Sequence, residues 1–300
     1  MRESKQLFVT YSYDEIGPFI LFEDLDQRKQ WKQYFDSKSL TIQLTDERRC
    51  VGTFDLATFN TYSCPNHSIL EKSNKGERCS VCQYKVGFNP AFYNAESISP
   101  HQKKYNETPH VVYLAYFSPL HIKVGIASEK RQTIRLLEQG ARAAIVLERF
   151  SDAYKARGLE KRLLTSRDGL LERLTSNTKY NLLVDEVFSF HNAYSKLEEV
   201  VKTHYGTTTD GEIIDLSKHY FYGKSENMPT DMFRITDNVT VITGRLVGMI
   251  GENIIVAQKE ATGDVFLPIP VKKWASHLVS LSQNSSEVRY SYDSKQMALW

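Results

Sequence analysis

The segment between residues 111 and 160 constrains the fold most, because two strand patterns and two helix patterns follow one another closely there. Residues 111–117 are continuously apolar or aromatic, as in a strand buried on both faces. In residues 122–126, apolar side chains alternate with Lys123 and Gly125, which predicts a second strand with one buried face. We expect the two strands to form a hairpin within an α+β fold.

The first helix is predicted over residues 129–139, where Ser128 is a suitable N-cap and Gly140 a suitable end. Arg131 and Arg135 are one helical turn apart, so two guanidinium groups are expected on one face. The plainer interpretation is a charged face that only meets solvent.

The second helix is predicted over residues 152–165, and Glu160 falls inside its apolar stripe. An isolated carboxylate there would cost on the order of several kcal/mol. Glu160 is therefore expected to be protonated, to bind a metal ion, or to pair with an arginine. A structural ion pair with Arg131 or Arg135 is the simplest of these explanations.

These motifs resemble the GIY-YIG endonuclease superfamily, with residues 111–113 at the first motif and residues 123–125 at the second. The chain more closely resembles an uncharacterised bacterial family, the domain of unknown function numbered 2797. This resemblance covers most of the chain and is carried by residues 49–52, 110–115, 123–125, 138–141, 156–160 and 244–248, together with the cysteine region.

The resemblance to GIY-YIG nucleases implies a role for each matching residue. Tyr113 would lie beside the attacking water, and Arg131 or Arg135 would hold the scissile phosphate. Glu160 would bind a single magnesium or manganese ion. Lys123 stands where many of these nucleases carry tyrosine, so the role of that hydroxyl is lost or replaced.

Four cysteines occur in the chain, and three of them lie in two short pairs, Cys64-Pro-Asn-His67 and Cys79-Ser-Val-Cys82. Two such pairs are typical of a closed tetrahedral zinc site, which is structural because four protein ligands leave no position for water. We expect the ligands to be Cys64, His67, Cys79 and Cys82. Cys50 is an alternative to His67, and free thiols are the simpler explanation.

Charge is concentrated on the predicted core. The whole chain has a formal net charge of only +2, but residues 101–180 contain fifteen Lys or Arg against eight Asp or Glu. This local excess favours an anionic partner, with DNA or RNA first and a small phosphorylated molecule next. The chain shows no signal peptide or long apolar segment, so we expect a cytoplasmic protein without a membrane partner.

We expect four regions. A β-rich N-terminal segment (1–57) precedes a zinc-binding cysteine and histidine region (58–108), a GIY-YIG-like core of a small antiparallel sheet with helices (109–205), and a β-rich C-terminal domain (206–300). The β-rich ends are expected to form a small barrel or sheet beside the core. Strands are predicted at 6–13, 18–23, 40–45, 238–244, 245–257 and 264–271, a packing helix at 186–204, a long loop at 206–237, and strand breaks at Gly248, Gly251 and Gly263.

The leading functional interpretation is a zinc-stabilised, GIY-YIG-like endonuclease that hydrolyses phosphodiesters in DNA or RNA with one magnesium or manganese ion. The first alternative is a nucleic-acid-binding protein that keeps the fold but does not cut. The second is an enzyme of specialised metabolism, with Tyr113, Lys123 and Arg135 around an anionic or carbonyl small molecule. The sequence does not indicate the oligomeric state.

Overall fold

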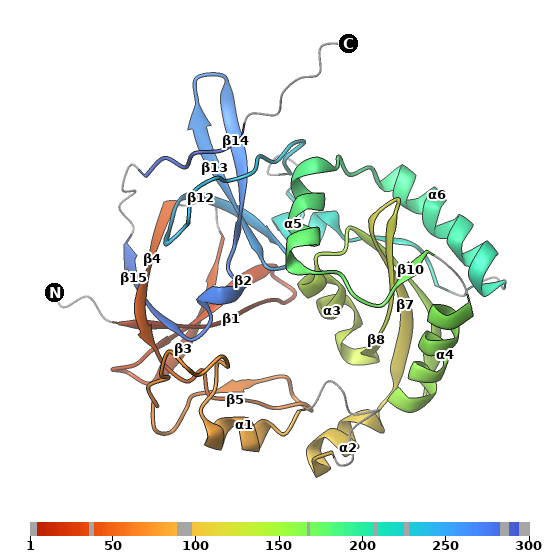
Figure 1. Ribbon diagram of the computed structural model, residues 1–300, viewed down its shortest axis with the longest axis horizontal. Helices are drawn as coiled ribbons and strands as arrows, with labels where there is room; N and C mark the ends of the chain where they lie inside the picture. The colour runs from red at the N-terminus through yellow and green to blue at the C-terminus, as the bar shows by residue number, and fades with distance from the viewer. Residues whose placement is uncertain are drawn as a thin grey trace.

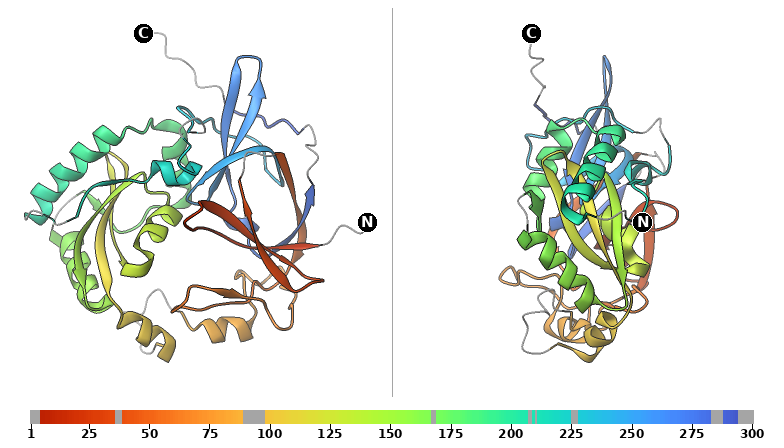
Figure 2. Two further views of the ribbon diagram at one scale, coloured as in Figure 1. Left: turned by 180° about the vertical axis from the view of Figure 1, so that it is seen from behind. Right: turned by 90° about the vertical axis from the view of Figure 1, so that its right-hand side faces the viewer.

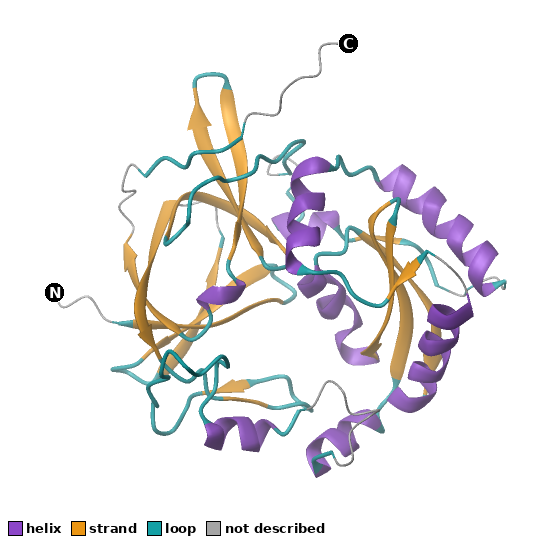
Figure 3. Ribbon diagram, in the orientation of Figure 1, coloured by secondary structure: helices purple, strands orange, loops and turns teal. Residues whose placement is uncertain are grey.

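A computed structural model describes residues 5–35, 39–88, 98–166, 169–206, 209, 211–224, 228–282 and 288–293. Within these ranges the chain has an α+β fold in which a curved eight-stranded sheet lies beside a smaller, helix-covered five-stranded sheet (Figure 1). Helices gather around the five-stranded sheet, whereas the eight-stranded sheet is built almost entirely of strands and loops (Figure 3).

The eight-stranded sheet combines strands from both ends of the chain. Its order is β14-β13-β12-β4-β15-β1-β2-β3, and every neighbouring pair is antiparallel. β4 therefore lies between two C-terminal strands. The strands are β1 (Gln6–Tyr13), β2 (Pro18–Asp24), β3 (Lys29–Tyr34), β4 (Ser39–Arg48), β12 (Val241–Ile250), β13 (Asn253–Glu260), β14 (Gly263–Pro270) and β15 (His277–Ser282).

The N-terminal strand predictions agree with β1, β2 and β4, and the predicted breaks at Gly251 and Gly263 are confirmed, but the one at Gly248 is wrong. Gly248 does not end a strand and instead lies inside β12. A Cβ at this position would lie 2.4 Å from the carbonyl oxygen of Tyr220, so glycine permits a close approach of two backbones. The break between β12 and β13 falls at Gly251, where φ is +58°.

The five-stranded sheet has the order β10-β8-β7-β9-β11. β7 and β8 form the predicted antiparallel hairpin, and every residue of β7 is buried, as its continuous apolar pattern indicates. β10 adds to β8 in parallel, so the sheet is mixed. The strands are β7 (His110–Ser118), β8 (His121–Ser128), β9 (Ala143–Phe150), β10 (Leu170–Leu171) and β11 (Ile214–Asp215).

Four helices cover the two faces of this sheet. α4 (Ala153–Ser166) and α6 (Phe190–Val200) pack on the face that carries Val112 and Leu114 of β7. α3 (Gln132–Gln139) and α5 (Ser176–Asp185) contact the opposite face, and they also contact strands of the eight-stranded sheet. One hydrophobic core therefore continues from the five-stranded sheet through α3 into the larger sheet.

The region predicted as a long loop contributes to this shared core. Its described residues include β11 and a 3₁₀ turn, Ser217–Phe221, in which Tyr220 and Phe221 are fully buried. The Tyr220 hydroxyl donates a hydrogen bond to the Ala141 carbonyl oxygen, and its ring lies edge-on to Tyr13 at 5.7 Å. This segment thus packs between the two sheets.

The cysteine region lies at one end of the molecule. It contains the short β5–β6 hairpin (Thr53–Phe54 and Thr61–Tyr62) and helices α1 (Ser80–Val86) and α2 (Pro100–Asn106). Seen from behind, β5, β6 and α1 lie below the eight-stranded sheet, and α2 lies below the five-stranded sheet (Figure 2). The end of the molecule that carries the cysteines therefore borders both sheets.

Candidate functional site

A cavity of about 620 Å³ brings together three of the residues predicted for chemistry. Lys123 of β8, Arg135 of α3 and Glu160 of α4 all line it. The remaining wall includes Tyr11 of β1 and Lys272, which follows β14, so both sheets contribute to what we call the candidate cavity.

Tyr113 packs behind these residues and is only 1% exposed. It lies opposite Gly125 in the β7–β8 pairing, and its hydroxyl accepts a hydrogen bond of 2.6 Å from Nε2 of Gln139. A Cβ on Gly125 would lie 2.6 Å from the Tyr113 oxygen and 2.9 Å from Nζ of Lys123. The missing side chain therefore allows the hydroxyl and the ammonium group to approach the same point. Burial raises the pKa of Tyr113.

Two lysines of the candidate cavity have lowered pKa values. Burial lowers the pKa of Lys123 to about 8, with Arg135 acting in the same direction and Glu160 opposing it. Burial also lowers the pKa of Lys179, on α5, to about 8. Sequence reasoning missed Lys179, because α5 was not predicted and no local pattern marks this residue.

Glu160 is 4% exposed, as its place in the apolar stripe predicted, but its partner differs from the expected ones. It pairs with Arg157, three residues earlier on the same helix, and not with Arg131 or Arg135. The other terminal nitrogen of Arg157 lies 3.0 Å from Glu172, which also lines the candidate cavity. Burial raises the pKa of Glu160 and the Arg157 guanidinium opposes this shift.

Arg131 and Arg135, which the sequence left as alternatives, both pair with Glu138 but differ in whether they line the candidate cavity. Arg131 belongs to a 3₁₀ turn before α3, and its Nη2 lies 2.6 Å from Glu138. Its guanidinium also lies over the rings of Phe54 and Phe59, at 5.7 and 5.1 Å from their centres. Nη1 of Arg135 lies 3.7 Å from the Glu138 carboxylate, so the expectation of two guanidinium groups on one face is confirmed. Of these two arginines, only Arg135 lines the candidate cavity.

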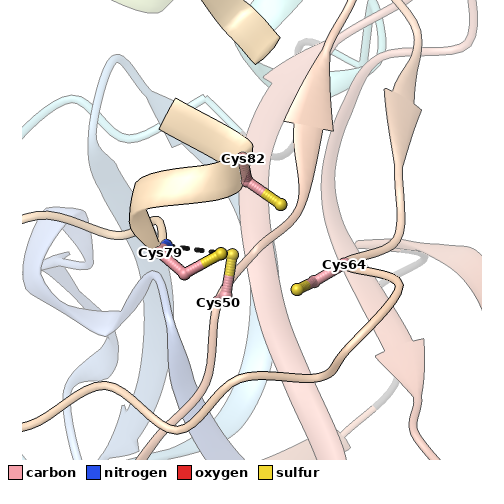
Figure 4. Close-up of side chains that lie close together, drawn as sticks. All are labelled: Cys50, Cys64, Cys79 and Cys82. Carbon is pink, nitrogen blue, oxygen red and sulfur yellow. Dashed lines mark hydrogen bonds between the residues drawn. The ribbon is translucent and has the colours of Figure 1, made fainter. Parts of the chain in front are cut away.

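The sulfur atoms of Cys50, Cys64, Cys79 and Cys82 all lie within 4.8 Å of one another (Figure 4). Zinc bound tetrahedrally at about 2.3 Å from each sulfur requires sulfurs roughly 3.8 Å apart, so this arrangement can hold the ion after small adjustments. Cys79 precedes α1 and Cys82 lies in its first turn, while Cys50 and Cys64 stand on either side of the β5–β6 hairpin. Four cysteine ligands would make the zinc site closed and structural.

The fourth candidate zinc ligand is therefore Cys50, which lies with the other three cysteines. The sequence had favoured His67 for this position. The Nδ1 atom of His67 lies instead 3.6 Å from Oε1 of Glu23, on β2. The backbone N–H groups of Gly52 and Cys79 donate hydrogen bonds to Sγ of Cys50, at 3.4 and 3.2 Å. Such donors stabilise thiolate charge around a metal.

The Cys79 thiol has a lowered pKa, whereas burial raises the pKa of Cys50 and Cys82. Burial alone would also raise the pKa of Cys79, but hydrogen bonds from the Cys82 backbone and from neighbouring thiols lower it to about 7. A thiolate near neutral pH is the ligand that zinc requires.

The sequence profile of one protein family, described as "Protein of unknown function (DUF2797)", matches residues 37–279. This match spans most of the chain, so the chain belongs to that family. No curated protein and no solved structure matches the chain. Among the helices of the described residues, none is both long and apolar enough to cross a membrane.

Proposed function

We propose that this protein is a metal-dependent phosphodiester hydrolase with a GIY-YIG-like core, and that nucleic acid is its substrate. The observation that carries the proposal is the meeting of Lys123, Arg135 and Glu160 at one cavity, with the Tyr113 hydroxyl packed behind it. These residues come from the separate motifs that resemble GIY-YIG nucleases. The order of hairpin, arginine helix and glutamate helix in β7, β8, α3 and α4 also supports it.

Phosphodiester hydrolysis needs a placed water molecule and positive charge where negative charge develops on the phosphate. Arg135 can supply that charge, because half of its side chain is exposed at the candidate cavity. Lys123 has a pKa of about 8, so most protein molecules carry it charged at neutral pH and a minority carry it as the uncharged amine. In this proposal, the uncharged amine accepts the proton of the attacking water.

Tyr113 orients that water. Its hydroxyl already accepts a hydrogen bond from Gln139, so its own proton remains available for donation. The raised pKa keeps this proton in place near neutral pH. Tyr113 therefore acts as a hydrogen-bond donor, while Lys123 is the group that changes its protonation state.

Glu160 and Glu172 fit a magnesium or manganese ion by their chemistry. Both line the candidate cavity, and one guanidinium, that of Arg157, holds both carboxylates. Carboxylate oxygens are the donors that magnesium prefers, and this ion keeps several of its waters, so one or two carboxylates suffice. When bound, the ion would supply charge for the oxygen that departs. Without the ion, Arg157 opposes the rise in the pKa of Glu160 that burial causes.

The test is cleavage of single- and double-stranded DNA and RNA with manganese, comparing wild type with Glu160→Gln at equal zinc content. We expect the wild type to cut at least one substrate and Glu160→Gln to lose the activity. Arg131→Gln is the matched control for Arg135→Gln, because only Arg135 lines the candidate cavity. Inert wild-type protein, or equal cutting by Glu160→Gln, would contradict the proposal.

One observation favours a second function, turnover of a small anionic molecule. The eight-stranded sheet contributes Tyr11, Glu252 and Lys272 to the candidate cavity, and its volume of about 620 Å³ is in the range of small-ligand sites. A thermal shift with nucleotides or sugar phosphates that disappears in Lys123→Met, without cleavage of any polynucleotide, would support this function. Salt-dependent binding without turnover would instead indicate a nucleic-acid-binding protein.

A further inference from the structure

A second hollow of about 620 Å³ lies between the β5–β6 hairpin and α2, outside the candidate cavity. Its lining includes four aromatic residues, three from the β5–β6 hairpin and one from α2, and we call it the aromatic groove. These residues are Phe54, Phe59, Tyr62 and Tyr105. Tyr62 is 52% exposed, which is unusual for a ring that only fills a core.

The rings of this groove hold one another in place. The centres of Phe54 and Phe59 are 6.2 Å apart, and Tyr105 meets Phe59 edge-on at 6.4 Å. The guanidinium of Arg131 packs over both phenylalanines and is itself fixed by Glu138. The aromatic side chains of the groove are therefore held in position before a ligand binds. This lowers the entropy cost of binding a flat ligand.

The lining of the aromatic groove carries more positive than negative charge. Lys85, Lys104 and Lys130 line it, and none of them forms an ion pair with another residue in the part of the chain that the structure describes. Two acidic residues also line it, and of these Asp55 keeps its charge whereas Glu129 is neutralised by an ion pair. Asp55 accepts hydrogen bonds from the backbone of its own turn, and Glu129 pairs with Arg149 at 3.0 Å.

The aromatic groove and the candidate cavity both share lining residues with a third hollow. A smaller hollow of about 270 Å³ shares Phe54 and Phe59 with the groove, and it shares Tyr11 and Glu138 with the candidate cavity. The three hollows thus follow one another along the boundary between the cysteine region, β1 and α3.

One exposed ring and three half-buried rings beside unpaired ammonium groups suit unpaired nucleotides, because bases stack on aromatic faces only when they have left a duplex. We propose that an unpaired DNA or RNA strand binds in the aromatic groove and continues into the candidate cavity. Bases stack on Tyr62 and Tyr105, and phosphates lie against Lys104 and Lys130. This inference rests on the proposed function for what happens in the candidate cavity, but the binding step can be measured alone.

The cysteine cluster supports this site. Cys50 and Cys64 stand just before and just after the hairpin that carries Phe54 and Tyr62. Zinc bound by these cysteines would therefore fix one wall of the aromatic groove, and loss of zinc would loosen it.

The experiment is fluorescence anisotropy of labelled single-stranded DNA, single-stranded RNA and duplex DNA with the zinc-loaded full chain, without added magnesium. We expect Tyr62→Ala to weaken single-strand binding about tenfold. Tyr84→Ala is the matched control, because Tyr84 is 88% exposed on α1 and lies outside the groove lining. The double variant Lys104→Gln/Lys130→Gln should reduce the slope of log affinity against log salt by about 1.4. Lys259→Gln, on exposed β13 surface, should leave that slope nearly unchanged.

The outcomes separate the two proposals. Single-strand binding that depends on Tyr62, without cleavage of any substrate, would support the groove and contradict the hydrolase. Cleavage that needs Glu160 but does not change in Tyr62→Ala or in the double lysine variant would overturn the groove. Tighter binding of duplex than of single strands, or equal losses in Tyr62→Ala and Tyr84→Ala, would also overturn it. The DNA and RNA arms decide which unpaired strand is preferred.

Discussion

Replacing Gly125 by alanine tests the packing on which the candidate site depends. The added methyl group would lie 2.6 Å from the Tyr113 oxygen, 2.8 Å from the adjacent ring carbon and 2.9 Å from Nζ of Lys123. Lys123 can move its flexible end, but Tyr113 is 1% exposed and is held by Gln139. Gly125 does not have a positive φ angle, so alanine causes no backbone strain there. The loss of stability comes from steric overlap.

The expected loss of stability follows from three contributions. Overpacking of a buried site costs about 1–3 kcal/mol. Weakening the hydrogen bond between Gln139 and Tyr113 adds about 1 kcal/mol. Alanine in a strand gains back about 0.5–1 kcal/mol relative to glycine. We therefore expect Gly125→Ala to be about 1–3 kcal/mol less stable than wild type, measured by urea unfolding of zinc-loaded protein at unchanged m-value.

Gly158→Ala provides the control, because Gly158 lies on α4 near Glu160 and an added Cβ would meet no atom within 4 Å. Alanine in a helix is favoured over glycine, so this variant should be more stable by up to about 1 kcal/mol. If Gly125→Ala unfolds at the wild-type urea concentration while Gly158→Ala is stabilised, the close approach of Tyr113 to β8 is refuted. The site built on that approach then loses its basis.

Three further predictions concern single residues. Cys50→Ser should lose zinc on metal analysis, whereas His67→Ala should keep about one zinc per chain, because only Cys50 stands with the other cysteines. The pKa of Lys123 is lowered from 10.5 to about 8, so the unfolded chain binds more protons between these pH values and folding gains stability as pH rises through that window. Lys123→Met should therefore be more stable than wild type below about pH 8, and urea unfolding should show this advantage shrinking towards pH 10.5. Arg135→Gln should weaken binding of inorganic phosphate measured by calorimetry, and Arg131→Gln should leave it unchanged.

Local patterns were sufficient for the elements around the candidate site. The apolar run of β7, the alternation of β8 and the helix end at Gly140 predicted a hairpin followed by a helix, and the structure has both. Helical periodicity also placed Glu160 in the buried stripe of α4. These features depend on residues two to four positions apart in the sequence. The sequence of one short segment is therefore sufficient to predict them.

The contacts between distant residues could not be predicted from local patterns. His67 has the spacing of a zinc ligand pair. Cys50 nevertheless lies with the other cysteines, because the residues after β4 bring it to Cys79, whose backbone N–H donates a hydrogen bond to the Cys50 sulfur. Arg157 was available at the right helical spacing, and considering it would have identified the partner of Glu160. Lys179 enters the candidate cavity only because α5 packs against both sheets. Such meetings depend on tertiary packing, which a single segment does not encode.

The strand order of the larger sheet has a consequence for the growing polypeptide. The four cysteines and the residues Tyr113, Lys123, Arg135 and Glu160 are all made before residue 241, where β12 begins, while β4 still lacks both of its neighbours. Pairing strands so distant in sequence is slow, and an unpaired strand edge invites association with other chains. Because Glu252 and Lys272 are also made late, a nascent chain would carry its metal ligands and its candidate residues long before the cavity acquires its last wall. The candidate cavity can therefore form only after the strands from β12 to β14 and the residues that follow β14 have been made.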